Sequence, residues 1–229
     1  ENLSRAKPLA ARLRPRTLDE FVGQGHILGP DKLLRRLIDN DRLGSVIFFG
    51  PPGTGKTSLA RVLASETKCH FEQLSAILHG VKDLREVLQK ARDRLATGDH
   101  GTVLFIDEIH RFNRAQQDAL LADVEEGVVT LIGATTSNPF FAVNGSLVSR
   151  STIFQFEPLS SKEIAELIQT ALDDRERGLG DQNIQLDEDG LQHLAEVCDG
   201  DARQALSVLE SACVSLTKPK HLTLDVIRE

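Results

Sequence analysis

The segment from Gly50 to Thr57 constrains the fold of this chain more than any other feature of its sequence. It reads Gly-Pro-Pro-Gly-Thr-Gly-Lys-Thr and matches the pattern G-x-x-x-x-G-K-[ST] at every fixed position. A short apolar run over residues 45–49 precedes it, and a helical pattern over residues 56–67 follows it. Because strand, glycine-rich loop and helix follow one another directly, the sequence predicts the start of a parallel α/β sheet.

The same loop predicts a site for ATP or ADP with Mg²⁺. Glycines let the backbone turn its N–H groups toward phosphate oxygens, and the following helix presents its positive end to the same anion. Lys56 would supply charge to the β- and γ-phosphates, and the Thr57 hydroxyl would bind Mg²⁺. A glycine-rich turn without a ligand is the alternative. We expect the nucleotide to contact Gly50, Pro51, Pro52, Gly53, Thr54, Gly55, Lys56, Thr57 and Ser58.

The alternation of strands and helices continues as far as Pro158. Further strands are expected at 70–74, 102–106, 128–134 and 153–156, with helices at 31–40, 81–95 and 115–124. After Ser160, which forms a capping box with Glu163, only helices are expected, at 161–177, 187–198 and 201–216. The sequence therefore predicts an α/β P-loop core with a five-stranded parallel sheet at residues 1–158 and a small all-helical lid at 159–229.

An acid pair ends the strand predicted at residues 102–106. Asp107 and Glu108 follow four apolar residues, and the carboxyl ends of parallel strands are where ligands collect in an open sheet. We expect Asp107 to bind Mg²⁺ through water and Glu108 to orient and deprotonate the attacking water. A capped loop is the alternative interpretation.

Three more side chains are candidates for contact with the transferred phosphate. Arg150 stands at the edge of the predicted core, where it could reach the nucleotide of a neighbouring subunit. Arg203 opens a lid helix and could contact the γ-phosphate of its own chain. Thr136 ends a strand, and its hydroxyl could bind the γ-phosphate or the water. Surface arginines and a simple strand cap are the alternatives, and we interpret His110 as structural.

Composition limits the other classes of function. The net charge of −7 would not attract a polyanion, so any contact with nucleic acid needs a local basic surface. The amino-terminal segment supplies one candidate surface, and a solvated segment is the alternative: Arg5, Lys7, Arg12, Arg14 and Arg16. The spacing of Cys69, Cys198 and Cys213 fits neither a disulfide framework nor a zinc site, as expected of a cytoplasmic protein. No apolar run is long enough to cross a bilayer.

Taken in order, these motifs resemble the clamp-loader branch of the AAA+ ATPases. More specific sequence stretches resemble RarA, the bacterial relative of the Werner-interacting ATPases, and the resemblance extends from Pro8 to Leu216. The stretches that carry this resemblance are residues 110–113, 116–119, 133–139 and 143–150. Residues 14–24 are similar to the adenine-pocket entry segment, which implies that Val22 and Gly23 contact the nucleotide.

The resemblance implies a DNA-stimulated ATPase that acts at stalled or damaged replication forks in the bacterial cytoplasm, associated with the nucleoid. It implies single-strand-binding protein as a partner and a homo-oligomer, a tetramer, formed by a region beyond the lid that we expect to lie outside this chain. Ser137 and Phe140 depart from the family text, in the loop before Arg150. Two alternatives stay open: a RuvB-like branch-migration motor, and a clamp-loader subunit that uses ATP as an assembly switch.

Overall fold

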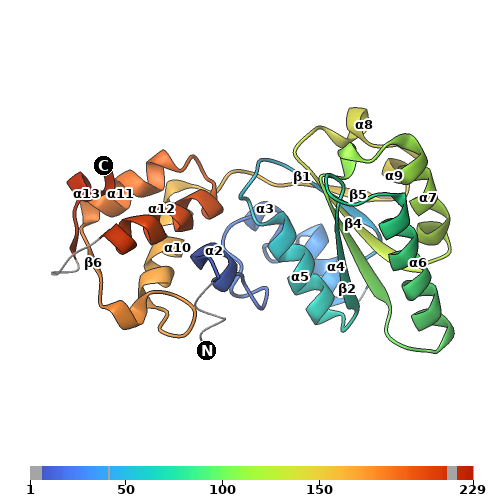
Figure 1. Ribbon diagram of the computed structural model, residues 1–229, viewed down its shortest axis with the longest axis horizontal. Coiled ribbons are helices and arrows are strands. Elements are labelled where there is room, and N and C mark those ends of the chain that lie inside the picture. Colours follow the sequence, from blue (N-terminus) through green and yellow to red (C-terminus); the bar gives the residue numbers. More distant parts are fainter. Residues whose placement is uncertain (1–6, 41, 216–220, 229) are drawn as a thin grey trace.

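The computed structural model describes residues 7–40, 42–215 and 221–228. Figure 1 shows an α/β part and a mainly helical part side by side, with the short helix α2 (Leu9–Arg12) between them. None of the described helices is both long and apolar enough to cross a membrane.

A five-stranded parallel sheet forms the centre of the α/β part, as predicted. Its strands are β1 (Val46–Phe49), β2 (His70–Ser75), β3 (Thr102–Asp107), β4 (Val129–Thr135) and β5 (Thr152–Gln155), in the order β2-β3-β4-β1-β5. The carboxyl end of β4 therefore lies between the loop that follows β1 and the acid pair that ends β3. This order brings three separate parts of the sequence to one edge of the sheet.

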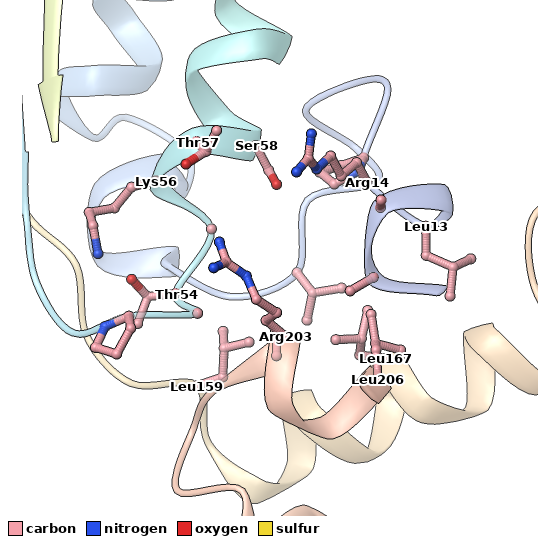
Figure 2. Close-up of a pocket in the computed structure, with 18 of the residues that line it drawn as sticks. Leu13, Arg14, Thr54, Lys56, Thr57, Ser58, Leu159, Leu167, Arg203 and Leu206 are labelled. Atoms are coloured by element: carbon pink, nitrogen blue, oxygen red, sulfur yellow. The ribbon is translucent and has the colours of Figure 1, made fainter. Parts of the chain in front are cut away.

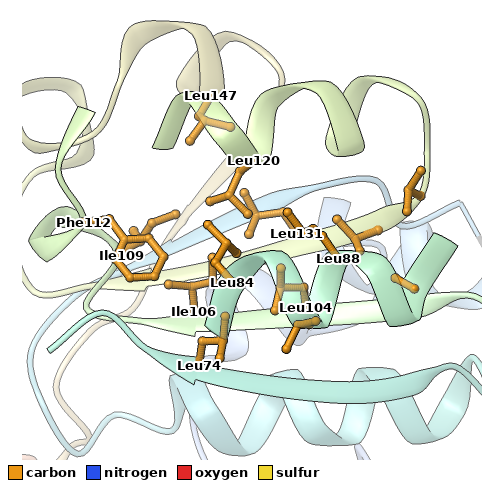
Figure 3. Close-up of a cluster of buried hydrophobic side chains, with 14 of the residues drawn as sticks. Leu74, Leu84, Leu88, Leu104, Ile106, Ile109, Phe112, Leu120, Leu131 and Leu147 are labelled. Atoms are coloured by element: carbon orange, nitrogen blue, oxygen red, sulfur yellow. The ribbon is translucent and has the colours of Figure 1, made fainter. Parts of the chain in front are cut away.

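Helices cover both faces of the sheet, so the inner strands are buried on both sides and their sequences are continuously apolar. On one face, α6 (Val81–Ala96), α7 (Arg114–Glu125) and α9 (Gly145–Ser149) pack on the strands, and Figure 3 shows the resulting cluster, which includes Leu84, Leu104 and Leu120. On the other face lie α3 (Gly25–Leu28), α4 (Leu33–Asp39) and α5 (Lys56–Glu66).

The helical part contains α10 (Ser161–Asp173), α11 (Glu188–Val197), α12 (Ala202–Ser215) and α13 (Leu224–Arg228), which share one hydrophobic cluster. The predicted capping box is present, because Glu163 N–H donates to Ser160 Oγ and Ser160 N–H donates to Glu163. Helix α10 ends at Asp173 rather than at 177. The Asp174 carboxylate accepts hydrogen bonds from the N–H groups of Glu176 and Arg177 and closes a turn there.

Two features of this part were not predicted. A short parallel ladder joins β6 (Gln185–Leu186) to β7 (His221–Leu222), so the lid is helical with a small strand pair added. In addition, α2 packs on α12, and Leu9 belongs to the lid cluster although it lies near the amino end of the chain. The division at residues 158/159 stays a prediction, and the contact of α2 with the lid crosses it.

The remaining short elements are the 3₁₀ helix η1 (Ile109–Arg111), α8 (Pro139–Ala142) and the 3₁₀ helix η2 (Gly180–Gln182). Both η1 and α8 closely follow the carboxyl ends of strands. As a result, the segments that follow β3 and β4 stay close to the carboxyl-terminal edge of the sheet, where Asp107, Glu108 and Thr136 lie.

Candidate active site

A cavity of about 580 Å³ lies between the α/β part and the lid. Four regions of the sequence line it: the amino-terminal segment, the loop after β1 with the start of α5, the carboxyl ends of β3 and β4, and the lid. Most predicted site residues are among those that line it: Val22, Pro52, Gly53, Thr54, Gly55, Lys56, Thr57, Ser58, Asp107, Glu108, Thr136 and Arg203.

The loop after β1 leaves its backbone donors free. Within the described part of the chain, the N–H groups of residues 53–57 donate no hydrogen bond, and they lie at the amino end of the 11-residue helix α5. Free N–H groups at a helix amino end, together with the helix dipole, form a binding site for an anion. The cradle expected from the sequence is therefore open toward the cavity.

Lys56 is the buried cation of this loop. Its side chain is 8% exposed, and its Nζ donates to the carbonyl oxygens of Gly50 (2.8 Å) and Pro51 (2.5 Å). Gly50 and Pro51 do not line the cavity, and their contact with nucleotide stays a prediction. Burial lowers the pKa of Lys56, and the negative charges of Glu108 and Asp107 oppose that shift. A phosphate beside Nζ would favour the charged form in the same way.

Gly53 is the point where the lid touches the loop. The N–H of Ala202 donates to Gly53 O (3.2 Å), and the Asp201 carboxylate lies beside the Gly53 Cα. A Cβ atom at this position would stand 1.8 Å from Asp201 Oδ1, and the φ angle of +70° is itself unfavourable for other residues. Glycine is therefore required here both by the backbone conformation and by the contact with the lid.

The acid pair lies across the cavity from the loop. Asp107 is half-buried, and burial together with the neighbouring charge of Glu108 raises the pKa of its carboxyl group. Glu108 has left-handed backbone angles (φ 53°, ψ 46°), and its Oε2 accepts a hydrogen bond from Thr136 Oγ1 (3.2 Å). Thr136 thus lies next to the glutamate, as the strand order requires.

Arg203 and an apolar wall complete the lid side of the cavity. Figure 2 shows the Arg203 side chain extending from the start of α12 toward the loop, with Arg14 near Ser58. Leu159, Leu167 and Leu206 from the lid and Leu13 from the amino-terminal segment supply apolar surface. A pocket with one apolar wall and one polar wall suits a molecule that joins a flat aromatic ring to a charged chain.

Gly23 does not line the cavity, although Val22 does. A Cβ on Gly23 would stand 2.2 Å from Leu159 Cδ2, so this glycine allows the segment to approach the lid. The next residue, Gln24, is buried, and its amide bonds to both backbone groups of Glu157. These contacts hold the amino-terminal segment against the connection between β5 and the lid.

Arg150 lies apart from this cavity. Its Nε is 2.5 Å from Glu125 Oε1 at the end of α7, and its Nη1 donates to Ser146 O (3.0 Å). It does not line the cavity formed by its own chain. Arg150 could therefore contact a bound nucleotide only in the cavity of another subunit, as the sequence analysis expects.

The residues present fit a magnesium ion that is held jointly with phosphate. Thr57 and Asp107 both line the cavity and offer a hydroxyl and a carboxylate oxygen, which Mg²⁺ prefers. Among the described residues, no group of three His, Cys, Asp or Glu side chains could hold a metal ion by itself. The protein would thus supply one or two ligands, and phosphate oxygens and water the others.

One part of the site, its apolar wall, was missed in the sequence analysis. The apolar wall comes from separate segments with ordinary helical patterns, and no local signal marks it. Gln24 is a residue of the predicted entry segment, and its left-handed, buried position gave no signal in the sequence. The structural interpretation of His110 stays a prediction: the residue does not line the cavity, and its Nδ1 lies 3.2 Å from Glu108 Oε2.

The sheet order, the open loop at the end of β1, the acid pair on β3 and the helical lid define a P-loop protein of the AAA+ class. The family model for the ATPase family associated with various cellular activities (AAA) matches residues 46–159. A second model, the AAA C-terminal domain, matches residues 180–229.

Curated relatives narrow this class. Replication-associated recombination protein A from Haemophilus influenzae is 47% identical over 204 residues, which are 89% of this chain and 45% of that protein. Its Escherichia coli counterpart is 45% identical over the same shares. The ATPase WRNIP1 of Dictyostelium discoideum is 42% identical over 97% of this chain and 26% of its own length. The chain belongs to the RarA and Werner-interacting family of AAA+ ATPases, and it spans less than half the length of these relatives.

Solved structures agree on the fold. The Holliday junction branch migration motor RuvB of Thermotoga maritima superposes with a TM-score of 0.76 and 28% sequence identity. The match covers 95% of this chain and 71% of that one. The α/β part and the lid of this chain are therefore both present in the motor.

Proposed function

We propose that this chain binds and hydrolyses ATP with Mg²⁺, and that the full-length protein couples hydrolysis to the remodelling of DNA or of DNA–protein complexes in replication-fork maintenance, recombination and repair. One observation carries the proposal: β4 lies between β1 and β3, so the free N–H groups of the loop, Thr136 and the acid pair surround one cavity. The similarity to replication-associated recombination protein A supports the biological part.

Each residue of the cavity has a task in this proposal. The N–H groups of residues 53–57 and Lys56 would bind the phosphates, with Lys56 exchanging its present carbonyl partners for phosphate oxygens. Thr57 and Asp107 would hold Mg²⁺, which supplies charge neutralisation to the phosphates when bound. The apolar wall, with Val22, would enclose the adenine ring.

The water that attacks the phosphate needs a base and a fixed position. Glu108 would accept its proton, because the carboxylate faces the cavity and is held by Thr136. The Thr136 hydroxyl, which donates to Glu108 in this structure, would lie next to the γ-phosphate as well. Binding of the γ-phosphate would therefore change the hydrogen bond that Glu108 accepts from Thr136. Arg203 would add positive charge from the lid of the same chain, and Arg150 from a neighbouring subunit.

The assembly and partners of the full-length protein are part of the same proposal. We infer a homo-oligomer, a tetramer, and DNA with single-stranded or forked structure as the activating partner. Single-strand-binding protein is the expected protein partner, and a bacterial cytoplasmic, nucleoid-associated location fits these roles.

A steady-state ATPase assay on the full-length protein tests the proposal. We expect Mg²⁺-dependent turnover that rises with gapped or forked DNA, and a loss of at least about 100-fold in Lys56→Ala and Glu108→Gln, since each removes a group that acts in the transition state. Asp189→Asn, which changes an exposed carboxylate outside the cavity, is the control and should turn over normally. Unchanged turnover in both site variants would refute hydrolysis at this site.

The superposition with RuvB favours a second candidate, a branch-migration motor. ATPase assays with gapped, forked and four-way-junction DNA distinguish the RarA-type function from the branch-migration motor. Stimulation by four-way junctions alone, with no response to gaps or forks, would favour the motor. Stimulation by single-stranded ends and gaps would favour the RarA-type function.

A further inference from the structure

His110 makes contacts that neither nucleotide binding nor the core requires. It lies in η1, directly after the acid pair, and its side chain is 13% exposed. Its Nδ1 is 3.2 Å from Glu108 Oε2 and 2.9 Å from Thr135 Oγ1. The imidazole therefore joins the carboxylate at the end of β3 to the last residue of β4.

The hydrogen bonds around Thr135 assign the proton on this imidazole. Thr135 is fully buried, and its hydroxyl donates its single hydrogen to Ser137 O (3.1 Å) while it accepts from Ser137 N–H (3.0 Å). Toward His110 it can then only accept. The ionised Glu108 carboxylate is also an acceptor only, so both contacts are favourable when Nδ1 carries the hydrogen: the N–H group donates to Thr135 Oγ1, and its positive end lies close to Glu108 Oε2.

The backbone of Glu108 has an unusual conformation, so contacts of its side chain matter for the position of the carboxylate. Its left-handed conformation is unfavourable for a residue with a side chain. Two side chains contact the same oxygen: Thr136 Oγ1–H donates a hydrogen bond to it, and His110 Nδ1 lies beside it, each at 3.2 Å. Among the described residues, no hydrogen bond engages Oε1, which leaves this oxygen for a water molecule.

We propose that His110 is a positioning residue that fixes the Glu108 carboxylate for deprotonation of the attacking water and links it to β4. The inference rests on the proposed function, since it concerns the base of that reaction. His110, itself hydrogen-bonded to Thr135 of β4, places its Nδ1–H group beside Oε2, so Oε2 has two favourable contacts and the rotation of the carboxylate is restricted. Without the imidazole only Thr136 holds Oε2, and Thr136 is the residue expected to change partners when a γ-phosphate binds.

The prediction concerns kcat more than substrate binding. Misplacement of a catalytic group by about 1 Å lowers a rate by up to about 100-fold. We expect His110→Ala to lower the DNA-stimulated kcat by about 10- to 100-fold, with KM for ATP changed by less than about threefold, because no His110 contact reaches the loop that binds phosphate.

Two further variants show whether the donor itself is responsible. Asparagine can place an amide N–H close to the position of Nδ1, so His110→Asn should recover most of the lost kcat. His70→Ala is the control. His70 also pairs with a carboxylate, Asp99 at 2.9 Å, but it starts β2 at the opposite end of the sheet.

The experiment measures kcat, KM and nucleotide affinity for all three variants in the full-length protein, alongside Lys56→Ala. Normal kcat in His110→Ala, or His110→Asn as slow as His110→Ala, would overturn the inference. A parallel loss of nucleotide affinity in His110→Ala would also overturn it. The proposed function fails separately, if Lys56→Ala turns over normally. If Lys56→Ala is inactive and His110→Ala is normal, only the positioning role is lost.

Discussion

Asp107, the proposed Mg²⁺ ligand, is placed where its charge weakens the nucleotide-free fold. Its carboxylate is half-buried beside Glu108, and both conditions disfavour the ionised form. The raised pKa means that the folded state keeps this proton to a higher pH than the unfolded chain does. Its contribution to stability is therefore most favourable below the unfolded pKa and is lost as pH rises through the raised pKa.

Asp107→Asn should consequently raise the Tm of the nucleotide-free protein at neutral pH. The difference in Tm between variant and parent should grow as the pH is raised from about 4, the unfolded pKa of aspartate, and then level off. Thermal melts over this pH series check it. A Tm difference independent of pH in Asp107→Asn would contradict the account. Mg²⁺-dependent turnover should be lost in the same variant.

Gly53 offers a second test at the scale of single residues. Gly53→Ala should weaken nucleotide binding by at least about 10-fold, because it adds a strained φ and a clash with Asp201 at the point where the lid meets the loop. Calorimetric titration with ADP or ATP measures this effect.

Gly98 supplies a matched control for this change. It has nearly the same φ (+72°), but an added Cβ would meet nothing within 4 Å. Gly98→Ala should therefore lower Tm through backbone strain alone and leave nucleotide affinity unchanged. Equal nucleotide affinity in the two variants would show that contact with the lid is not what requires glycine at residue 53.

Sequence analysis identified the site residues that belong to a short, continuous sequence motif. Lys56 and Thr57 follow from the loop pattern, and Glu108 follows from an apolar run that ends in two acids. His110 and Asp201 could not be assigned in this way. Their roles depend on side-chain directions and on the approach of segments that are distant in the sequence, such as Gly53 and Asp201.

At the scale of secondary-structure elements, α2 is held by tertiary contacts. A helix of four residues is too short to be stable alone, so its position depends on its neighbours. Glu210 of α12 accepts a hydrogen bond from the Leu9 N–H (2.9 Å) and pairs with Arg12 (3.4 Å). One carboxylate thus joins the amino-terminal segment to the lid.

Glu210→Ala should lower the free energy of unfolding by about 1–3 kcal/mol, since it leaves the partly buried Leu9 N–H without its acceptor and removes one of the two acceptors of the Arg12 guanidinium, which keeps Gly178 O. In a chain of this size that is a fall in Tm of about 2–4 °C per kcal/mol. Nucleotide affinity should fall as well, because residues of α2 and Leu13 line the cavity. Both are measurable by thermal melts with and without ADP.

An exposed ion pair provides the comparison for this variant. Glu166 lies 4.0 Å from Lys162 on the surface of α10, and such pairs contribute little. Glu166→Ala should change Tm by less than about 1 °C. If Glu210→Ala behaves in the same way, α2 is not held by this carboxylate.

The elements themselves illustrate which parts of the fold are local. All five strands and the long helices were predicted to within a few residues, because each has its own hydrophobic pattern. The end of α10 was placed too late, since the Asp174 turn depends on a side-chain bond. The order of the strands was not predicted, because pairing of β1 with β4 and β5 joins residues about 80–110 positions apart and leaves no periodic trace in the sequence.

At the scale of the whole molecule, the position of Arg150 sets a requirement for assembly. The arginine is held at the end of α7 by Glu125, outside the cavity of its own chain, while the cavity carries Lys56, Arg203 and the acid pair. If Arg150 serves the reaction, each complete site combines residues from two subunits. A contact of this kind is heterologous, with one face giving the arginine and a different face receiving it.

Mixing two inactive variants of the full-length protein tests this arrangement. Lys56→Ala keeps its arginine but has a defective loop, whereas Arg150→Ala keeps its loop but lacks the arginine, so each alone should be inactive. In an equal mixture with random exchange of subunits, about one site in four joins an intact loop to an intact arginine. The mixture should therefore recover about a quarter of the parental ATPase activity. Recovery would be absent if Arg150 acted within its own chain, because no subunit of the mixture holds both residues.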